Sequence, residues 1–247
     1  MTISRCLLLS VGLLLGCGKK SEPAPPVPKT PPAILVFAKT NGFHHASIAV
    51  GIETVRQLGR ENSFRVDTTT NAAKFRLDSL RNYQAVVFLS TTGDLLNDEQ
   101  QTAFEQYIRL GRGFVGIHAA TDAAYTRPWY HRLVGAYFDN HPAIQQATVR
   151  VIDNTHAATR FLPAAWVRTD EWYNFRDVAT DLHLLATLDE TTYSGGTHGT
   201  THPIAWYHSY DGGRAFYTAG GHTDDSFREP LFIRHLLGGI TYALGGE

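Results

Sequence analysis

Short, continuous runs of apolar residues recur along the first half of the chain. Residues 33–38 (AILVFA), 83–89 (YQAVVFL) and 114–117 (FVGI) are three such runs. Runs of this length without a polar face are typical of strands that are buried on both sides in a parallel sheet. Residues 64–68 (FRVDT) alternate between apolar and polar side chains and predict one more strand.

Two segments between these runs have the spacing of helices. Residues 47–60 carry apolar side chains at near-helical intervals, and Ser47 is placed to cap their start. A second helix is predicted to begin at Asn97, with acidic residues in its first turn, and to stop at Gly111. Strands alternating with helices in this way predict a single α/β domain. Its sheet is expected to be doubly wound and mostly parallel, with helices on both faces.

The second half of the chain is less regular. Residues 147–152 alternate in polarity and predict an exposed or edge strand. Further elements are expected as strands at residues 183–188, 203–208 and 214–218 and as a closing helix at residues 232–244, interrupted by Gly238 and Gly239.

The first 32 residues differ in character from the rest. A basic residue precedes an apolar run that is too short to span a bilayer, and the run ends in LLGC at Cys17. This ending resembles the bacterial lipoprotein signal, in which cleavage leaves the cysteine as a lipid-modified first residue. We therefore expect a signal peptide at residues 1–16, a lipid-anchored, Pro-rich tether at residues 17–32 and a folded domain at residues 33–247. The expected location is the periplasmic face or the cell surface. The alternative is an ordinary secretory signal in which Cys17 has no role.

Charge and cysteine content narrow the classes of function. Lys and Arg number 22 and Asp and Glu number 23, with no basic run, so no nucleic-acid partner is expected. The only two cysteines lie within the first 17 residues, which leaves the predicted domain without a disulfide, a thiolate nucleophile or a Cys metal ligand. Twelve histidines, all beyond residue 40, favour a histidine-lined site.

Polar and titratable residues follow one predicted strand after another, where an open α/β sheet brings them to one rim. The segment GFVGIHAATD is the most informative, because a buried strand ends abruptly on His118. In several α/β enzymes this strand-to-helix corner carries a nucleophilic Cys or Ser. After the first strand come the adjacent His44 and His45, of which only one is expected to face the site.

The second half adds carboxylates and aromatic residues. The acids of DEWY (residues 170–173) stand beside flat aromatic rings, a combination used in sugar recognition. Glycines before His222 allow the backbone to approach a ligand. His141 and His202 each precede a proline and are interpreted as structural. No G-x-S-x-G, phosphate-loop, H-E-x-x-H or G-x-G-x-x-G motif is present, which leaves carboxylate–histidine acid/base chemistry, with or without a metal.

A series of motifs in one order resembles the trehalose-utilisation (ThuA-like) family across about residues 33–245. These motifs are NGFHHASI, GFVGIHAATD, GAYFDNHP, DEWYNF, HPIAWYH, RAFYTAGGHT and FIRHLLGGITYAL. The resemblance implies a flavodoxin-like fold similar to that of class I glutamine amidotransferases. In those enzymes the corner at His118 carries the nucleophilic cysteine, which is missing here. A Cys-dependent amidotransferase is therefore not expected.

The resemblance also implies a role in disaccharide catabolism, often beside sugar dehydrogenases that make 3-keto sugars. Together with the positions after the strands, it gives the expected site residues. These are His118, Glu171, His222 and Asp122 for catalysis, His44, Trp172, Tyr173 and Asn41 for substrate binding, and His44, His118 and His222 as candidate metal ligands. Trp172 is larger than its counterpart in many relatives and would change substrate preference if it faces the pocket.

We therefore expect a protein that acts on a small carbohydrate or a 3-keto sugar. His118 would be the general base or a ligand of Zn²⁺ or Mn²⁺, with Glu171 as its acid/base partner. The expected partners are a sugar dehydrogenase of the same pathway and a membrane reached through the N-terminal lipid. One alternative is a non-catalytic, membrane-tethered carbohydrate-binding or assembly module. The other, an amide hydrolase, is disfavoured because the chain lacks a nucleophile.

Overall fold

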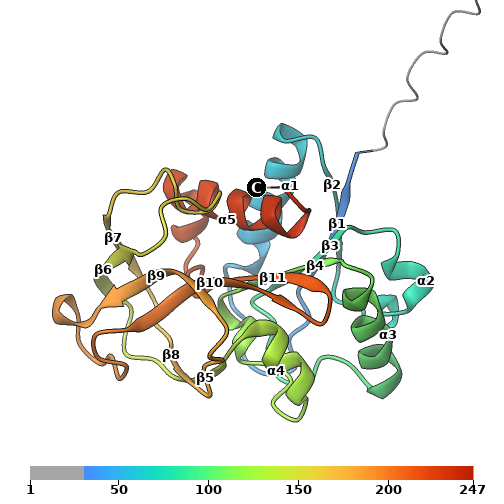
Figure 1. The fold of residues 1–247 in the computed structure, drawn as a ribbon, viewed down its shortest axis with the longest axis horizontal. Coiled ribbons are helices and arrows are strands. Elements are labelled where there is room, and N and C mark those ends of the chain that lie inside the picture. The colour runs from blue at the N-terminus through green and yellow to red at the C-terminus, as the bar shows by residue number, and fades with distance from the viewer. Residues whose placement is uncertain (1–30, 247) are drawn as a thin grey trace, which may run out of the picture. The chain divides into compact units, whose positions relative to one another are not determined.

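A nine-stranded sheet runs through residues 31–246, the part of the chain that the computed structural model describes (Figure 1). The strand order is β2-β1-β3-β4-β11-β10-β9-β6-β7. The predicted signal peptide, the lipidation site Cys17 and all but the end of the tether lie outside the described residues.

The first half of this sheet is parallel. Its strands are β1 (Ala33–Phe37), β2 (Arg65–Thr69), β3 (Ala85–Leu89), β4 (Gly113–Ile117) and β11 (Gly213–Thr218). Every residue of β1, β3 and β4 is buried, as the apolar runs predict. The chain leaves β1 to form β2 on one side and returns to form β3 on the other, so the sheet has a topological switch point between β1 and β3. This is the order of a flavodoxin-like sheet.

The second half of the sheet is antiparallel. It contains β10 (His202–Tyr210), β9 (His183–Asp189), β6 (Gln145–Val151) and β7 (Ala165–Asp170). The sheet changes direction at the hairpin between β10 and β11, where Asp211 and Gly212 both have positive φ, as tight hairpin turns require. The predicted α/β class is confirmed, with a mixed sheet.

Two details of this half differ from the sequence-based expectation. Strand β6 pairs on both sides, and the edge is β7, which was not predicted. A separate two-stranded sheet of β5 (Tyr137–Asn140) and β8 (Asn174–Arg176) was also not predicted, because these strands have only 4 and 3 residues.

Helices cover both faces of the sheet, with α1 and α5 on one face and α3 and α4 on the other (Figure 1). The α-helices are α1 (Ile48–Glu61), α2 (Leu77–Leu80), α3 (Asp98–Arg109), α4 (Pro128–Val134) and α5 (Pro230–Ala243). The 3₁₀ turns are η1 (Ala72–Lys74), η2 (His118–Thr121), η3 (Glu190–Thr192) and η4 (Ser226–Arg228). Among residues 31–246, no helix combines the length and apolar character needed to cross a bilayer.

Local signals explain where these helices begin and end. The side chain of Asn97 accepts a hydrogen bond from the Gln100 backbone nitrogen, and the Gln100 side chain accepts one from the Asn97 backbone nitrogen, which forms a capping box at the start of α3. Ser47 stands at the N-cap of α1, but its hydroxyl donates to the Gly221 carbonyl at 3.0 Å instead of capping the helix. The loop before α1 is thereby tied to the loop after β11.

The closing helix α5 is continuous, although an interruption was expected at its glycine pair. Gly238 packs against the backbone of residues 157–158, and Gly239 packs against the ring of Phe216. A Cβ atom at either glycine would overlap these neighbours. The glycines therefore let the helix approach the rest of the core closely and do not break it.

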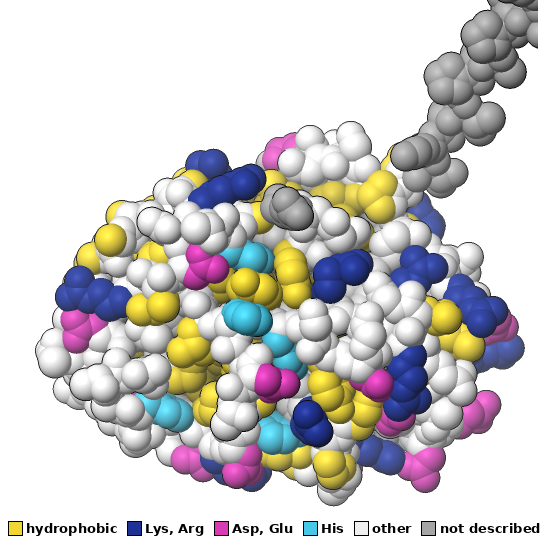
Figure 2. Space-filling view, in the orientation of Figure 1, with side chains coloured by type: hydrophobic (Ala, Val, Ile, Leu, Met, Phe, Trp, Pro, Cys, Tyr) yellow, Lys and Arg dark blue, Asp and Glu magenta, His cyan; other side chains and the backbone are white. Residues whose placement is uncertain are grey.

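Charged side chains of both signs are interspersed on the face shown in Figure 2, with no continuous basic stripe on that face.

Candidate functional site

The strand-to-helix corner at His118 has the geometry that its sequence predicts. At the end of β4 the backbone enters the left-handed region at His118 (φ 51°) and turns directly into η2. A non-glycine residue in this region costs roughly 1–3 kcal/mol and persists only where its surroundings hold it there. Here Tyr217 donates a hydrogen bond to the His118 carbonyl at 2.7 Å, and the histidine side chain is fully buried.

One hydrogen bond fixes the tautomer of His118. Its Nδ1 lies 2.8 Å from the carbonyl oxygen of Ala219. A carbonyl oxygen only accepts, so Nδ1 carries the hydrogen. In the neutral ring, the lone pair is therefore on Nε2, which points to the centre of the site.

Three further side chains surround His118 Nε2. The Nε2 of His45 lies 3.2 Å away, the Nδ1 of His222 3.3 Å away and the Oε2 of Glu171 3.5 Å away. The Oε2 of Glu171 is also 3.0 Å from the Nδ1 of His222. One ligand atom from each of the four residues lies within 4.8 Å of all the others. We call His45, His118, Glu171 and His222 the histidine cluster.

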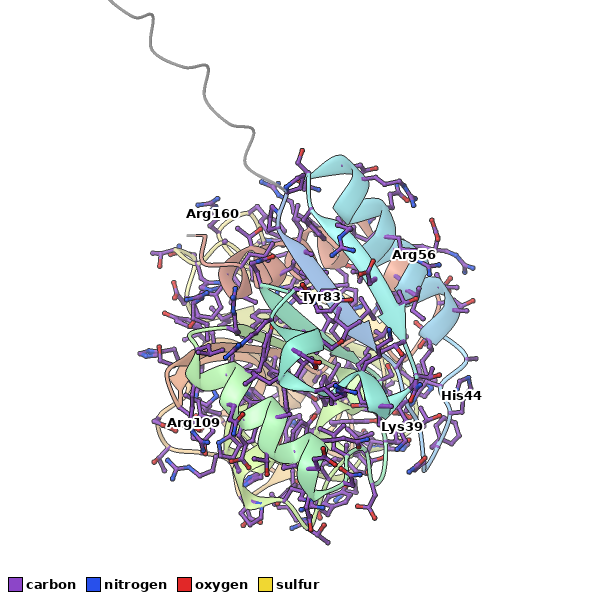
Figure 3. The ribbon with its side chains drawn as sticks, turned by 90° about the vertical axis from the view of Figure 1, so that its right-hand side faces the viewer. Lys39, His44, Arg56, Tyr83, Arg109 and Arg160 are labelled. Atoms are coloured by element: carbon purple, nitrogen blue, oxygen red, sulfur yellow. The ribbon has the colours of Figure 1, made fainter. Side chains whose placement is uncertain are left out.

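The expectation that His44 would belong to the site is corrected by the structure. His44 is exposed, its Nδ1 faces the Thr40 hydroxyl at 3.2 Å, and Figure 3 shows it on an outer loop. The adjacent His45 is 3% exposed and enters the cluster instead. The side chains of two adjacent residues just before a helix point in different directions. The sequence does not say which of the two points inward.

Asp170, which the sequence interpretation took as one of two acids for sugar recognition, is a buried carboxylate that holds two members of the cluster in place. Oδ1 of Asp170 accepts hydrogen bonds from the backbone nitrogens of Glu171 and His222, at 2.9 and 3.1 Å. Its Oδ2 accepts from the Gly221 nitrogen and the Ser226 hydroxyl. The guanidinium of Arg168, 3.1 Å away, balances its charge. A single side chain thus joins the loop after β7 to the loop after β11.

The environment sets the charges of the cluster. Burial, together with the neighbouring imidazoles of His118 and His222, lowers the pKa of His45 to about 3. Burial alone would raise the pKa of Glu171, but its hydrogen bonds with His118 and His222 bring that pKa well below its usual range. His45 is therefore neutral and Glu171 ionised at pH 7, and both are ready to bind a cation. The hydrogen bond with Glu171 raises the pKa of His222, so a metal would compete there with a proton.

A cavity of about 420 Å³ opens onto the cluster. Its lining combines titratable and aromatic side chains, namely Phe43, His45, Asp122, Phe138, His141, Glu171, Tyr173 and His222. We call it the histidine cavity.

The two aromatic residues of the DEWY segment have different positions. The ring of Tyr173 lines the cavity and packs 4.4 Å from the His118 ring and 4.3 Å from the Phe138 ring, centroid to centroid. Trp172 was expected to bind substrate, but it is fully buried and its indole nitrogen donates to the Gln145 carbonyl at 2.9 Å. Successive residues of an extended segment point to opposite sides, so Glu171 and Tyr173 face the cavity while Trp172 faces the core.

Two more titratable groups stand on the cavity wall, outside the cluster. Asp122, predicted from the sequence, is half-buried and accepts a hydrogen bond from the Tyr125 hydroxyl at 2.6 Å. Burial raises the pKa of its carboxyl. The Nδ1 of His141 lies 3.1 Å from the Oε1 of Glu171. The sequence interpretation treated His141 as structural because it precedes a proline, although its place in a family-like motif was a usable signal.

The remaining candidates lie elsewhere. Asn41 is exposed, and its side-chain amide donates to the Asp94 carbonyl at 2.5 Å. It lines a different cavity, described below. His202, interpreted as structural, is buried, and its Nε2 lies 2.8 Å from the carbonyl oxygen of Tyr173. It therefore supports the backbone that carries the cavity's tyrosine.

Comparison with known families identifies the chain. Residues 33–243 match the family model described as ThuA, trehalose utilisation. The chain belongs to the ThuA family. No curated protein matches it.

Several solved structures share the fold of this ThuA family member. A putative ThuA-like protein from Bacteroides uniformis is 24% identical, with 89% of this chain and 94% of that chain covered and a TM-score of 0.74. A putative ThuA-like protein from Parabacteroides merdae is 22% identical, covers 87% and 91%, and has a TM-score of 0.75. A β-galactosidase from Bacillus circulans is 13% identical, and the match covers 87% of this chain but 31% of that one, with a TM-score of 0.56. At these identities the likeness concerns the fold alone.

Proposed function

We propose that this ThuA family member is an enzyme of carbohydrate metabolism that acts on a keto sugar in the histidine cavity, with a divalent metal ion held by the histidine cluster. The observation that carries the proposal is the convergence of three imidazole nitrogens and one carboxylate oxygen from four separate loops. Such groups are costly to bury together unless a cation or protons compensate them.

The spacing of the cluster supports a metal. Zinc binds histidine nitrogen at about 2.0–2.1 Å in tetrahedral geometry, which places the ligand atoms about 3.3 Å from one another. Four of the six separations in the cluster are 3.0, 3.2, 3.3 and 3.5 Å, and all six are within 4.8 Å. The hydrogen bond from His118 Nδ1 to a carbonyl is the kind of outer contact that orients a ligating imidazole. Mixed imidazole and carboxylate ligands suit Zn²⁺ or Mn²⁺.

The cavity wall supplies groups for proton transfer. A bound metal would polarise the carbonyl of the substrate. Asp122 then takes the proton from the carbon next to the carbonyl, for which its raised pKa suits it. The electron pair of that C–H bond displaces the glycosidic oxygen from the following carbon. His141, which is half-exposed in the cavity, gives a proton to the departing alcohol. In this scheme His118 and Glu171 would hold the metal.

The aromatic side of the cavity favours a sugar as the ligand. Phe43, Phe138 and Tyr173 present flat apolar surfaces in the cavity, next to its imidazoles. A sugar ring has C–H faces that pack on such surfaces and hydroxyls that bind carboxylates. The family's description, trehalose utilisation, agrees with this class of ligand.

The test combines metal analysis with turnover of 3-keto-trehalose by the purified full chain. We expect about one equivalent of Zn²⁺ or Mn²⁺ and measurable turnover, and both should be lost in His118→Ala. His44→Ala is the matched control, because it removes an exposed histidine from outside the cluster, and it should keep both properties. No turnover by the wild type, or equal turnover and metal content in His118→Ala, would refute the proposal.

A carbohydrate-binding or assembly module without catalysis is the second candidate, and the missing cysteine at the His118 corner favours it. Calorimetric binding of sugars by a chain that turns over no keto sugar would support it. Under either candidate we propose that the scaffold is related to class I glutamine amidotransferases and that a lipid on Cys17 anchors the exported chain. Incorporation of labelled palmitate that is lost in Cys17→Ser would test the anchor.

A further inference from the structure

A second cavity, of about 570 Å³ and broadly open to solvent, lies beside the histidine cavity at the carboxyl ends of β1, β2 and β3. Its lining residues are Lys39, Asn41, Thr70, Asn71, Ala72, Ala73, Asp94, Leu95, Leu96, Asn97 and Gln100. Figure 3 shows Lys39 at the same end of the strands as His44. Ligands of open α/β sheets bind outside the carboxyl ends of the strands at the topological switch point, which here lies between β1 and β3. We call this cavity the switch-point cavity.

Neutral hydrogen-bonding groups dominate its lining. The side-chain oxygens of Asn71 and Asn97 each accept a backbone hydrogen bond, and the side-chain oxygen of Gln100 accepts one from the Asn97 nitrogen. Among residues 31–246, none of these three amide NH₂ groups donates a hydrogen bond, so all three are available to a ligand. The Asp94 carboxylate and the Asn41 side-chain oxygen also have no hydrogen-bond donor among the described residues. Donors and acceptors side by side match hydroxyl groups, which both donate and accept.

The charges of this cavity disfavour an anion. The ammonium group of Lys39 donates to the Leu95 carbonyl at 2.7 Å, and Asp94 in the same cavity offsets its charge. The first turn of α3 at its rim carries Asp98, which pairs with Arg127, and Glu99, so a phosphate there would meet one more carboxylate that has no cation partner among the described residues. Alanine and leucine side chains supply the apolar contact that C–H groups need. The chemistry fits a neutral polyhydroxylated group.

One short loop separates the two cavities. Asn41 lines the switch-point cavity, whereas Phe43 and His45 line the histidine cavity. Residues 41 and 43 are two positions apart, so the wall is at most about 7 Å wide along the chain. Thr92 fixes this wall, because its hydroxyl donates to the Phe43 carbonyl at 2.8 Å and accepts from the Gly42 nitrogen at 3.2 Å. The side chain of Phe43 is 64% exposed at this wall.

We propose that the two cavities are neighbouring subsites for a glycoside of at least two rings. The reacting ring occupies the histidine cavity, the next neutral ring occupies the switch-point cavity, and the exposed face of Phe43 supports the linkage between them. The proposal rests on the proposed function, because the histidine cavity defines which ring reacts. It adds a second, specific site for the ring that does not react.

Calorimetry on the full chain tests this directly, with methyl α-glucopyranoside as the one-ring probe and trehalose as the two-ring probe. We expect trehalose to bind about tenfold more tightly, which corresponds to about 1.4 kcal/mol. Ala73→Trp fills the switch-point cavity from an exposed position and should abolish this preference while leaving the one-ring affinity unchanged. Ala49→Trp, at an exposed position of α1 outside both cavities, is the matched control and should preserve the preference.

The outcomes separate this proposal from the proposed function. Equal affinities for the two probes in the wild type, or a preference that survives in Ala73→Trp, would overturn the subsite. If the preference behaves as expected but no keto sugar is turned over, the subsite stands and the catalytic proposal fails. Asp94→Asn provides a second variant, which removes one acceptor charge and should weaken trehalose binding severalfold without filling the cavity.

Discussion

Replacing Asp170 by asparagine should both destabilise the domain and weaken the site. The carboxylate accepts four hydrogen bonds and pairs with the buried guanidinium of Arg168, whose side chain is 4% exposed. Asparagine keeps the shape but has only one acceptor oxygen. If that oxygen serves Glu171 and His222, the new NH₂ group faces the Gly221 N–H and the guanidinium, both of which are donors.

The magnitude follows from these losses. Breaking one side of a buried ion pair costs about 3–5 kcal/mol. For a domain of this size, each kcal/mol lowers the melting temperature by about 2–4 °C, so we expect a fall of about 10 °C. Because Asp170 orients two of the four proposed metal ligands, the affinity for Zn²⁺ should fall about 10- to 100-fold.

Urea denaturation and competitive zinc titration measure these two effects. Ser226→Ala is the control, because it removes only one hydroxyl donor from Asp170 and should cost about 1 kcal/mol with little change in zinc affinity. If Asp170→Asn unfolds within 1 kcal/mol of the wild type, or binds zinc as tightly, then Asp170 does not hold the two loops as described.

Three further predictions concern pH, packing and a corrected residue. The pKa of His45 is about 3 in the folded chain, compared with a reference value of 6.5. Between pH 3 and pH 6.5 the unfolded chain therefore binds one more proton than the folded chain. Unfolding free energy should therefore fall as the pH drops from 6.5 toward 4, by up to about 1.4 kcal/mol per unit. When the unfolding free energy is measured by denaturation at several pH values, its dependence on pH should be weaker in His45→Asn and unchanged in His44→Asn. Gly239→Ala forces a methyl group against Phe216 and should cost about 1–3 kcal/mol by urea denaturation, so an unchanged stability would contradict the packing. Trp172→Leu should lower the melting temperature yet leave the relative affinities for sugars unchanged. An altered sugar preference would contradict this and indicate that Trp172 contacts the ligand.

Much of the fold could be predicted because its strongest signals are local. The strands predicted at residues 33–38 and 83–89 begin and end within two residues of β1 and β3, since a strand buried on both faces must be apolar throughout. The start of the helix at Asn97 was equally clear, because a capping box is contained in four residues. The short β5 and β8 pair through contacts between distant segments and leave no local pattern.

Part of the arrangement of the candidate site could be predicted for the same reason. His118 could be recognised because its position at the end of a buried strand is visible in the sequence itself. The choice between His44 and His45 depends on the direction in which a loop turns, and the roles of Asp170 and His141 depend on contacts across the sheet. Such contacts are fixed by tertiary packing, which a single sequence does not show.

The position of β11 has a consequence for when the site can exist. It is the last strand in the chain, yet it is the central strand of the sheet, between β4 and β10. Asp170 and His222 meet only after β11 has been inserted there, so a chain emerging from the ribosome holds at most three of the four cluster residues. The cluster is therefore a marker of completed folding. A metal bound to it would act as a late cross-link between segments 73, 53 and 51 residues apart, which closes long loops only once the whole domain is assembled.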